Sequence, residues 1–252
     1  MSEFYFEYIK NKLRKLLKEL KTIGMDYLKI KNGVLIGCIG ALLLAIGDWL
    51  IGYIDPTIIG DSMILVKGCR NVGYIRPVLS MLFAMVGAIM CTYGMLCKSD
   101  TIQSESKFKS LYKYSVIFGA LQWIFIHFIF CGFRYQYQYL WNENYGELAC
   151  DAINKVTEAF MPIILLSFMI IIIPFVVYFL ALLRKKTLFP RWMTICYMFT
   201  FSVIFKIVAQ ILGDTSISNG FSTSSNNMAI AIWFLCVYVY LSKFHRENKN
   251  KF

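Results

Sequence analysis

Residues 33–54 read GVLIGCIGALLLAIGDWLIGYI, and they contain a single charged side chain, Asp48. An α-helix needs about 20 predominantly apolar residues to cross the hydrocarbon core of a bilayer, so this stretch predicts a transmembrane helix. A carboxylate in hydrocarbon costs about 3 kcal/mol or more, and such a residue usually has a partner or a function. The stretch therefore predicts a membrane span with a polar position inside it.

Five further apolar runs are long enough, or nearly so, to cross a bilayer. They cover residues 77–97, 115–133, 161–183, 192–212 and 227–241. Hydrophobic residues make up 58% of the chain, and the mean hydropathy is +0.57. The sequence predicts an all-α fold, a polytopic membrane helix bundle with six transmembrane helices and an N-terminal amphipathic helix. Pro174, inside the fourth run, is expected to kink its helix.

The predicted domain organisation has three parts, and its first part is a basic amphipathic interfacial helix at residues 1–31. A six-span membrane domain at residues 32–243 follows, with a basic cytoplasmic tail at residues 244–252. Within the first part, apolar residues repeat at helical spacing over residues 4–23 and lysines fill the other faces. This pattern predicts a helix on the anionic inner leaflet, so membrane lipids are expected partners. The alternative is a solvated helix whose charges only fix the topology.

Lysine and arginine residues are distributed unevenly between the runs. Twenty of the 26 lie before the first run, after the second and fourth runs, or in the tail; five lie on the opposite side; and Lys206 lies within a run. Since basic residues concentrate on the cytoplasmic side, this predicts a multi-pass protein of the cytoplasmic (inner) membrane with both termini in the cytoplasm. The same clustering argues against nucleic-acid binding despite a net charge of +11.

Three ionisable residues, Asp48, His127 and Lys206, are predicted to lie at similar depth in the outer half of the membrane. They follow the inner ends of their runs by about 22, 18 and 21 Å at 1.5 Å per residue. One interpretation is an Asp48–Lys206 ion pair that fixes helix register, with His127 hydrogen-bonded nearby. The other is a polar pocket open to the outer leaflet, in which Asp48 and His127 exchange protons and Lys206 holds a phosphate or carboxylate.

The candidate catalytic residues are Asp48 and His127. The candidate ligand-binding residues are those of the polar layer and its aromatic neighbours: Asp48, Trp49, Trp123, His127, Lys206 and Gln210. The eight cysteines have no zinc-type spacing, and two histidines are few for a metal site, so no metal and no cofactor are expected.

The predicted outer connections differ in length and composition. Residues 55–76 and 134–160 are long enough to fold over the bundle, and the aromatic residues of the latter suit a membrane-interface belt or a lid. Residues 214–226 are rich in Ser, Thr, Asn and Gly and are typical of a flexible loop. Cys69 and Cys150 are the two cysteines of these connections, so they are the candidate disulfide pair; the alternative is two free thiols.

The segments Gly47-Asp48-Trp49-Leu50-Ile51-Gly52 and Pro190-Arg191-Trp192 resemble motifs of a family of bacterial multi-pass membrane proteins of unknown function. In that family the first span ends in a similar Gly-Asp-Trp motif, and a histidine of the third span is similar to His127. The resemblance covers residues 33–241 and implies a multi-pass fold but no activity. The basic N-terminal helix and the tyrosine-rich outer connection depart from the family pattern.

Three functions remain open at the level of sequence. The first is binding or transport of a small amphiphilic or lipid ligand through a polar pocket in the outer half of the bundle. The second is a lipid-acting membrane enzyme with Asp48 and His127 as acid and base, although the chain lacks the familiar hydrolase motifs. The third is a structural subunit of a membrane complex, and assembly as a homo-oligomer is also open.

Overall fold

The computed structural model describes residue 7, residues 27–54 and residues 72–249. Within this part of the chain the structure is helical, without strands, and six helical stretches are long and apolar enough to span a membrane. The predicted all-α six-span architecture is confirmed. The helices are α2 (Tyr27–Gly52), α3 (Ile75–Lys98), α4 (Lys107–Asn142), α5 (Gly146–Leu183), α6 (Met198–Ile211) and α7 (Ser216–Lys249), with short 3₁₀ segments η1 (Ser99–Thr101) and η2 (Arg191–Thr194).

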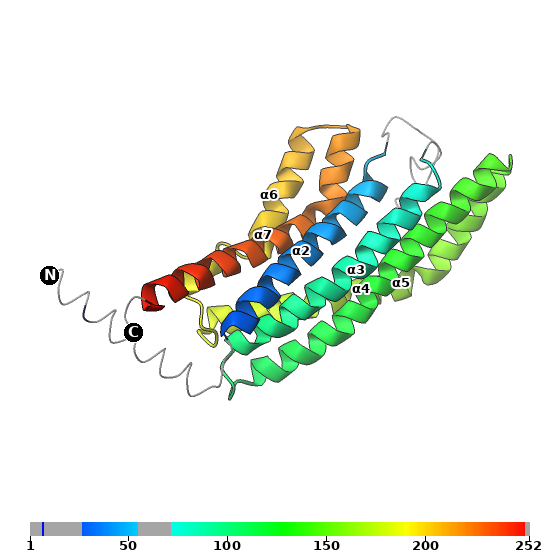
Figure 1. Cartoon of the computed structure of the whole chain (residues 1–252). Coiled ribbons are helices and arrows are strands. Elements are labelled where there is room, and N and C mark those ends of the chain that lie inside the picture. Colours follow the sequence, from blue (N-terminus) through cyan, green and yellow to red (C-terminus); the bar gives the residue numbers. More distant parts are fainter. Residues whose placement is uncertain (1–6, 8–26, 55–71, 250–252) are drawn as a thin grey trace.

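The helices pack side by side in the order α6, α7, α2, α3, α4 and α5 (Figure 1). Helix α2 lies between α3 and α7, and α6 packs mainly on α7. The beginning of α2 and the end of α7 lie at the same end of the bundle (Figure 1), as an even number of spans requires. We call this the inner end, in the orientation that the basic residues predict. The interfacial helix predicted for residues 4–23 lies outside the described residues apart from Glu7.

Small residues let α2 and α3 approach closely. A Cβ atom at Gly40 would lie 2.5 Å from the backbone nitrogen of Cys91 and 2.7 Å from the carbonyl oxygen of Gly87. The facing side of α3 is formed by buried Ala84 and Ala88. Membrane helices use such small-residue faces because close backbone contact replaces the hydrophobic driving force that is absent in lipid. This contact fixes α2, and with it Asp48, against α3.

Helices α4 and α5 are much longer than a bilayer requires. They have 36 and 38 residues, which correspond to about 54 and 57 Å, against a hydrocarbon core of about 30 Å. A short turn joins them, in which Asn144 has a φ of 65°. The prediction that residues 134–160 form a connection folded over the bundle is therefore wrong, because most of these residues extend the two helices outward as a hairpin.

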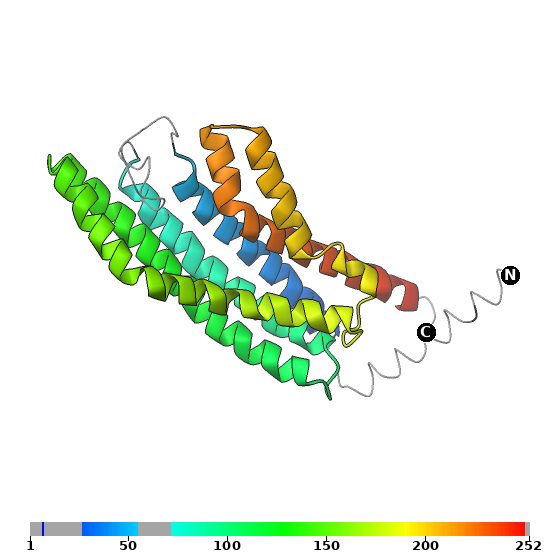
Figure 2. The same ribbon diagram turned by 180° about the vertical axis from the view of Figure 1, so that it is seen from behind.

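Prolines lie inside α5 at two positions, Pro162 and Pro174. Pro162 lies at the start of the fourth apolar run, and the helix continues through it. Each proline removes a backbone hydrogen bond and favours a bend, and α5 is visibly bent in Figure 2. Gly119 of α4 packs close to Pro174: a Cβ atom there would lie 3.5 Å from its ring.

The segment expected to be a flexible loop, residues 214–226, instead begins α7 at Ser216. Its hydroxyl groups donate back to carbonyls of the preceding turn, as in Thr223 to Asn219 at 2.8 Å and Ser224 to Gly220 at 2.7 Å. Such bonds bend helices slightly. In Figure 1, α7 changes direction between its polar first part, in orange, and its apolar second part, in red.

Candidate functional site

Asp48 lies one turn before the end of α2, and its carboxylate joins three helices. Its Oδ1 atom is 2.9 Å from Nε2 of His127 on α4, and its Oδ2 atom accepts a hydrogen bond of 2.6 Å from Nδ2 of Asn227 on α7. All three residues are buried, with exposed fractions of 8%, 7% and 4%. The structure therefore brings the two predicted residues Asp48 and His127 into direct contact, and adds Asn227.

Both ring nitrogens of His127 face oxygen atoms. Nε2 faces the carboxylate of Asp48, and Nδ1 is 3.2 Å from the backbone carbonyl oxygen of Trp123. A neutral imidazole has one N–H, so it can satisfy only one of these oxygens. Both contacts are satisfied when His127 is an imidazolium beside a carboxylate, or when its Nδ1 carries a proton and Asp48 is protonated. In either form the pair is neutral overall, which suits a buried membrane position.

We refer to Asp48, His127 and Asn227 as the Asp48 layer. Hydrogen bonds to backbone carbonyl groups near the end of α2 hold this layer in place. Ser80 of α3 donates to the carbonyl of Gly47 at 2.7 Å, and Cys131 of α4 donates to Ser80 at 3.6 Å. Arg76 donates to the carbonyl oxygens of Leu50 and Tyr53 at 2.5 and 2.7 Å, and Arg134 donates to that of Ile51. These arginines satisfy carbonyl groups of the last turn of α2 and of Tyr53 just after it, which have no partner within the helix.

Lys206 does not take part in this layer. It is exposed on α6, and within the described residues it forms no ion pair with Asp48. Helix α6 packs on α7 through Ser202, which donates to Asn226 at 2.6 Å, and through Phe205, stacked on Phe221 at 6.4 Å. Because α7 stands between α6 and α2, the predicted Asp48–Lys206 ion pair is wrong. Gln210 is likewise exposed on α6.

The two tryptophans predicted to line the pocket have different surroundings. Trp49 is partly buried against α7, with its ring 5.1 Å from that of Phe221. Trp123 is buried, and its ring meets that of Phe175 on α5 edge to face at 6.1 Å. Trp123 contributes to the polar layer through its backbone carbonyl.

The sulfur atom of Cys150 lies 3.8 Å from the hydroxyl oxygen of Tyr137. Its predicted partner, Cys69, lies outside the described residues, so the disulfide stays a prediction. No group of three or more His, Cys, Asp or Glu residues that could hold a metal ion is found in the part of the chain that the structure describes.

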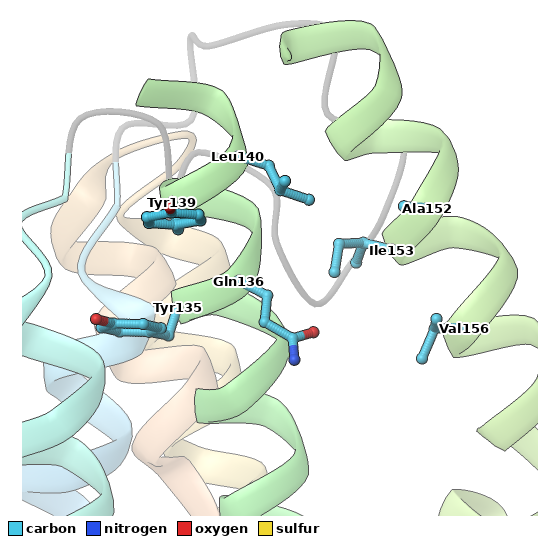
Figure 3. Close-up of a pocket in the computed structure, with 7 residues that line it drawn as sticks. All are labelled: Tyr135, Gln136, Tyr139, Leu140, Ala152, Ile153 and Val156. Carbon is cyan, nitrogen blue, oxygen red and sulfur yellow. The ribbon is translucent and has the colours of Figure 1, made fainter. Parts of the chain in front are cut away.

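An apolar pocket of about 250 Å³ lies between α4 and α5 in the outer hairpin (Figure 3). It begins at Tyr135, eight residues beyond His127 on α4, which corresponds to about 12 Å along the helix. It is lined by Tyr135, Gln136, Tyr139, Leu140, Ala152, Ile153 and Val156. The pocket contains no charged side chain and is separate from the Asp48 layer.

With this geometry in view, the chain can be compared with known proteins. The sequence model of a family described as "Family of unknown function (DUF6796)" matches residues 19–244. The chain belongs to this family. The match covers all six membrane-spanning helices, including the Asp48 layer. No curated protein and no solved structure matches the chain. Membership of DUF6796 thus agrees with the expected uncharacterised family and brings no activity with it.

In this DUF6796 chain, sequence reasoning missed Asn227, Arg76 and Arg134. Asn227 is the first residue of the last apolar run, where a polar residue is easily taken as the edge of a span. The two arginines were counted only as outer basic residues. One sequence feature could have pointed to these three residues. The buried Asp48 carboxylate and the last carbonyl groups of the first span need hydrogen-bond donors, and Asn and Arg side chains supply them.

Proposed function

We propose that this membrane protein binds or transports a small amphiphilic molecule, whose polar group contacts Asp48, His127 and Asn227. The observation that carries the proposal is the Asp48 carboxylate, held at 2.9 Å by His127 and at 2.6 Å by Asn227 inside three membrane-spanning helices. Ionisable residues within membrane spans are costly, and they commonly mark substrate or proton pathways. The neutral Asp48–His127 pair also supplies a proton that a ligand can displace.

The layer favours a ligand with hydrogen-bond donors. The Oδ1 atom of Asn227 is a buried acceptor without a partner among the described residues, and the Asp48 carboxylate is a second acceptor. An ammonium or hydroxyl head group matches these oxygens, whereas a phosphate does not. Lys206 keeps a separate role: it lies five residues before the end of α6, about 7.5 Å, so its side chain reaches outer head groups by snorkelling.

The experiment uses the purified protein in phosphatidylcholine nanodiscs and three decyl probes. We expect decylamine and decanol to raise the thermal unfolding temperature. Any shift caused by decyl phosphate should be the same in Asp48→Asn as in the parent protein, because the phosphate does not match the acceptors of this site. Asp48→Asn should abolish the decylamine shift because it removes the charge that the ammonium group contacts. Lys206→Met is the matched control, since it removes a charged residue of the same depth outside the layer, and it should keep the shift. Equal shifts in Asp48→Asn and the parent protein would reject the proposal.

A second function, a lipid-acting enzyme, draws support from the Asp48–His127 contact, because a carboxylate commonly orients and stabilises a catalytic histidine. His127 would have to release one of its two contacts to take a proton from water. Turnover of a fluorescent phospholipid that disappears in His127→Gln, with folding intact, would favour this function. Stabilisation by the decyl probes without turnover would favour binding. The structural-subunit alternative stays a prediction.

A further inference from the structure

A second buried charge lies at the inner end of the bundle. Lys98 is the last residue of α3, and only 1% of its surface is exposed. Its ammonium group is surrounded by four aromatic rings, with Nζ 4.2 Å from the centroid of Tyr178, 5.1 Å from Phe234, 5.4 Å from Trp233 and 5.8 Å from Tyr112. Within the described residues Lys98 forms no ion pair with a carboxylate. We refer to Lys98 and these four rings as the Lys98 cluster.

The Lys98 cluster draws on four helices and brings α5 and α7 into contact across the bundle. Lys98 lies on α3, Tyr112 on α4, Tyr178 on α5, and Trp233 and Phe234 on α7. The rings also contact one another, as in Tyr112 and Tyr178 at 5.1 Å and Tyr178 and Trp233 at 6.3 Å. Such rings stabilise a cation through their negative faces, but they do not accept the N–H bonds that water would accept.

The cluster contains hydrogen-bond donors without acceptors. The hydroxyl of Tyr112 and Nε1 of Trp233 are buried without a partner among the described residues. Indole nitrogen is a donor only, and an ammonium group has three hydrogens and no acceptor. By contrast, the hydroxyl of Tyr178 is paired with that of Thr101 at 2.7 Å. Buried polar groups in native proteins are nearly always paired, so the chemistry that this cluster lacks is an acceptor, and beside an ammonium group a negative one.

We infer that the Lys98 cluster binds a phosphate group at the inner end of the bundle. Lys98 supplies the positive charge, and the Tyr112 hydroxyl and the Trp233 indole supply two further donors. The phosphate can come from a free anion or from the head group of an inner-leaflet lipid, which share this chemistry. The inference does not depend on the Asp48 site: Ser80, which bonds to the carbonyl of Gly47, precedes Lys98 by 18 residues of α3, about 27 Å.

The test compares two buried tyrosines of the same cluster. Tyr112→Phe removes the hydroxyl without a partner, whereas Tyr178→Phe removes the hydroxyl that Thr101 already satisfies. Thermal unfolding is followed in dodecyl maltoside micelles, which contain no phosphate, while inorganic phosphate is added against sodium chloride of equal ionic strength. A parallel series adds phosphatidylglycerol to these micelles in phosphate-free buffer. Since a hydrogen bond to a charged group is worth about 1.5–3 kcal/mol, Tyr112→Phe should weaken phosphate binding at least about tenfold, and Tyr178→Phe should leave it unchanged.

Lys98→Met should abolish the stabilisation, and Trp233→Phe provides an independent variant in case Lys98→Met does not fold. Stabilisation by inorganic phosphate alone supports a free anion as the ligand, and stabilisation by phosphatidylglycerol alone supports a lipid head group. The inference is overturned if neither shifts the unfolding temperature of the parent protein. It is also overturned if Tyr112→Phe and the parent protein respond equally, since the donors would then serve water or nothing.

Discussion

The contact between Asp48 and His127 is the residue-scale feature whose energetics can be measured directly. Breaking a buried pair by removing one partner typically costs about 3–5 kcal/mol, because the other partner stays in a low dielectric without compensation. We expect Asp48→Asn and His127→Leu each to lower the free energy of unfolding by an amount of this order. The double variant should lose less than the sum of the two, as a double-mutant cycle in detergent would measure.

Lys206→Met is the control for this cycle. Lys206 is exposed and lies on a helix that does not adjoin α2, so its loss should add to that of Asp48→Asn without coupling. Coupling between Asp48 and Lys206, together with additivity between Asp48 and His127, would contradict the geometry described above.

The sequence predicted that Asp48 and His127 lie at a similar level, and the two residues meet, but it could not predict which helices are neighbours. Counting residues from the inner ends placed Asp48, His127 and Lys206 in one layer, and two of the three meet. Lys206 does not meet Asp48, because contact also requires that the lysine lie on a helix adjoining α2. Lys206 lies on α6, and α7 stands between α6 and α2. Hydropathy carries no information on which helices are adjacent.

At the scale of elements, the α2–α3 contact depends on residues without side chains. Gly40→Ala would place a Cβ atom 2.5 Å from a backbone nitrogen of α3, and backbone cannot move aside as a flexible side chain can. We expect the variant to lose about 1–3 kcal/mol of unfolding free energy, the usual cost of overpacking. Gly132→Ala on α4 is the matched control, because nothing lies within 4 Å of its added methyl group. It should be neutral or gain about 0.5–1 kcal/mol from its higher helix propensity; equal losses would contradict the assignment.

Helix ends were the weakest part of the sequence prediction, for a physical reason. Apolar runs mark where a helix contacts hydrocarbon, whereas the helix itself continues wherever its backbone bonds and caps allow. Residues 134–160 and 216–226 are polar enough to resemble loops, yet they lie in α4, α5 and α7 apart from the turn after Asn142. The membrane core of each span was predictable, and the protruding hairpin was not.

The length of this hairpin gives a prediction of its own. Spin labels at Phe128→Cys and Tyr145→Cys, in a background without native cysteines, sample exposed positions 17 residues apart. The label at residue 128 should collide mainly with molecular oxygen, which is apolar and concentrates in the lipid. The second should collide with a water-soluble nickel complex, because the outer part of α4 extends about 20 Å beyond the first position. A label at residue 145 that senses lipid would mean that the hairpin lies along the membrane.

At the scale of the whole molecule, the two buried polar centres, the Asp48 layer and the Lys98 cluster, lie toward opposite ends of the bundle. The Asp48 layer joins α2, α4 and α7 toward the outer end, and the Lys98 cluster joins α3, α4, α5 and α7 at the inner end. The inner end is closed further by the connections around Ile102 and Thr187, which pair as an isolated β-bridge. The positively charged Lys98 cluster thus lies at the end of the bundle that the basic residues of the connections predict to be cytoplasmic.

The orientation itself is tested with two exposed positions on opposite connections. Ser104 lies between α3 and α4, and Asp214 lies between α6 and α7. If basic residues mark the cytoplasmic side, an impermeant maleimide should label Asp214→Cys in intact cells and should reach Ser104→Cys only after permeabilisation. The reverse pattern would place the Asp48 layer in the cytoplasmic half and the Lys98 cluster at the outer surface, where an inner-leaflet phosphate could not reach it. Labelling of both positions from the same side would contradict the odd number of spans, α4, α5 and α6, that the structure places between them.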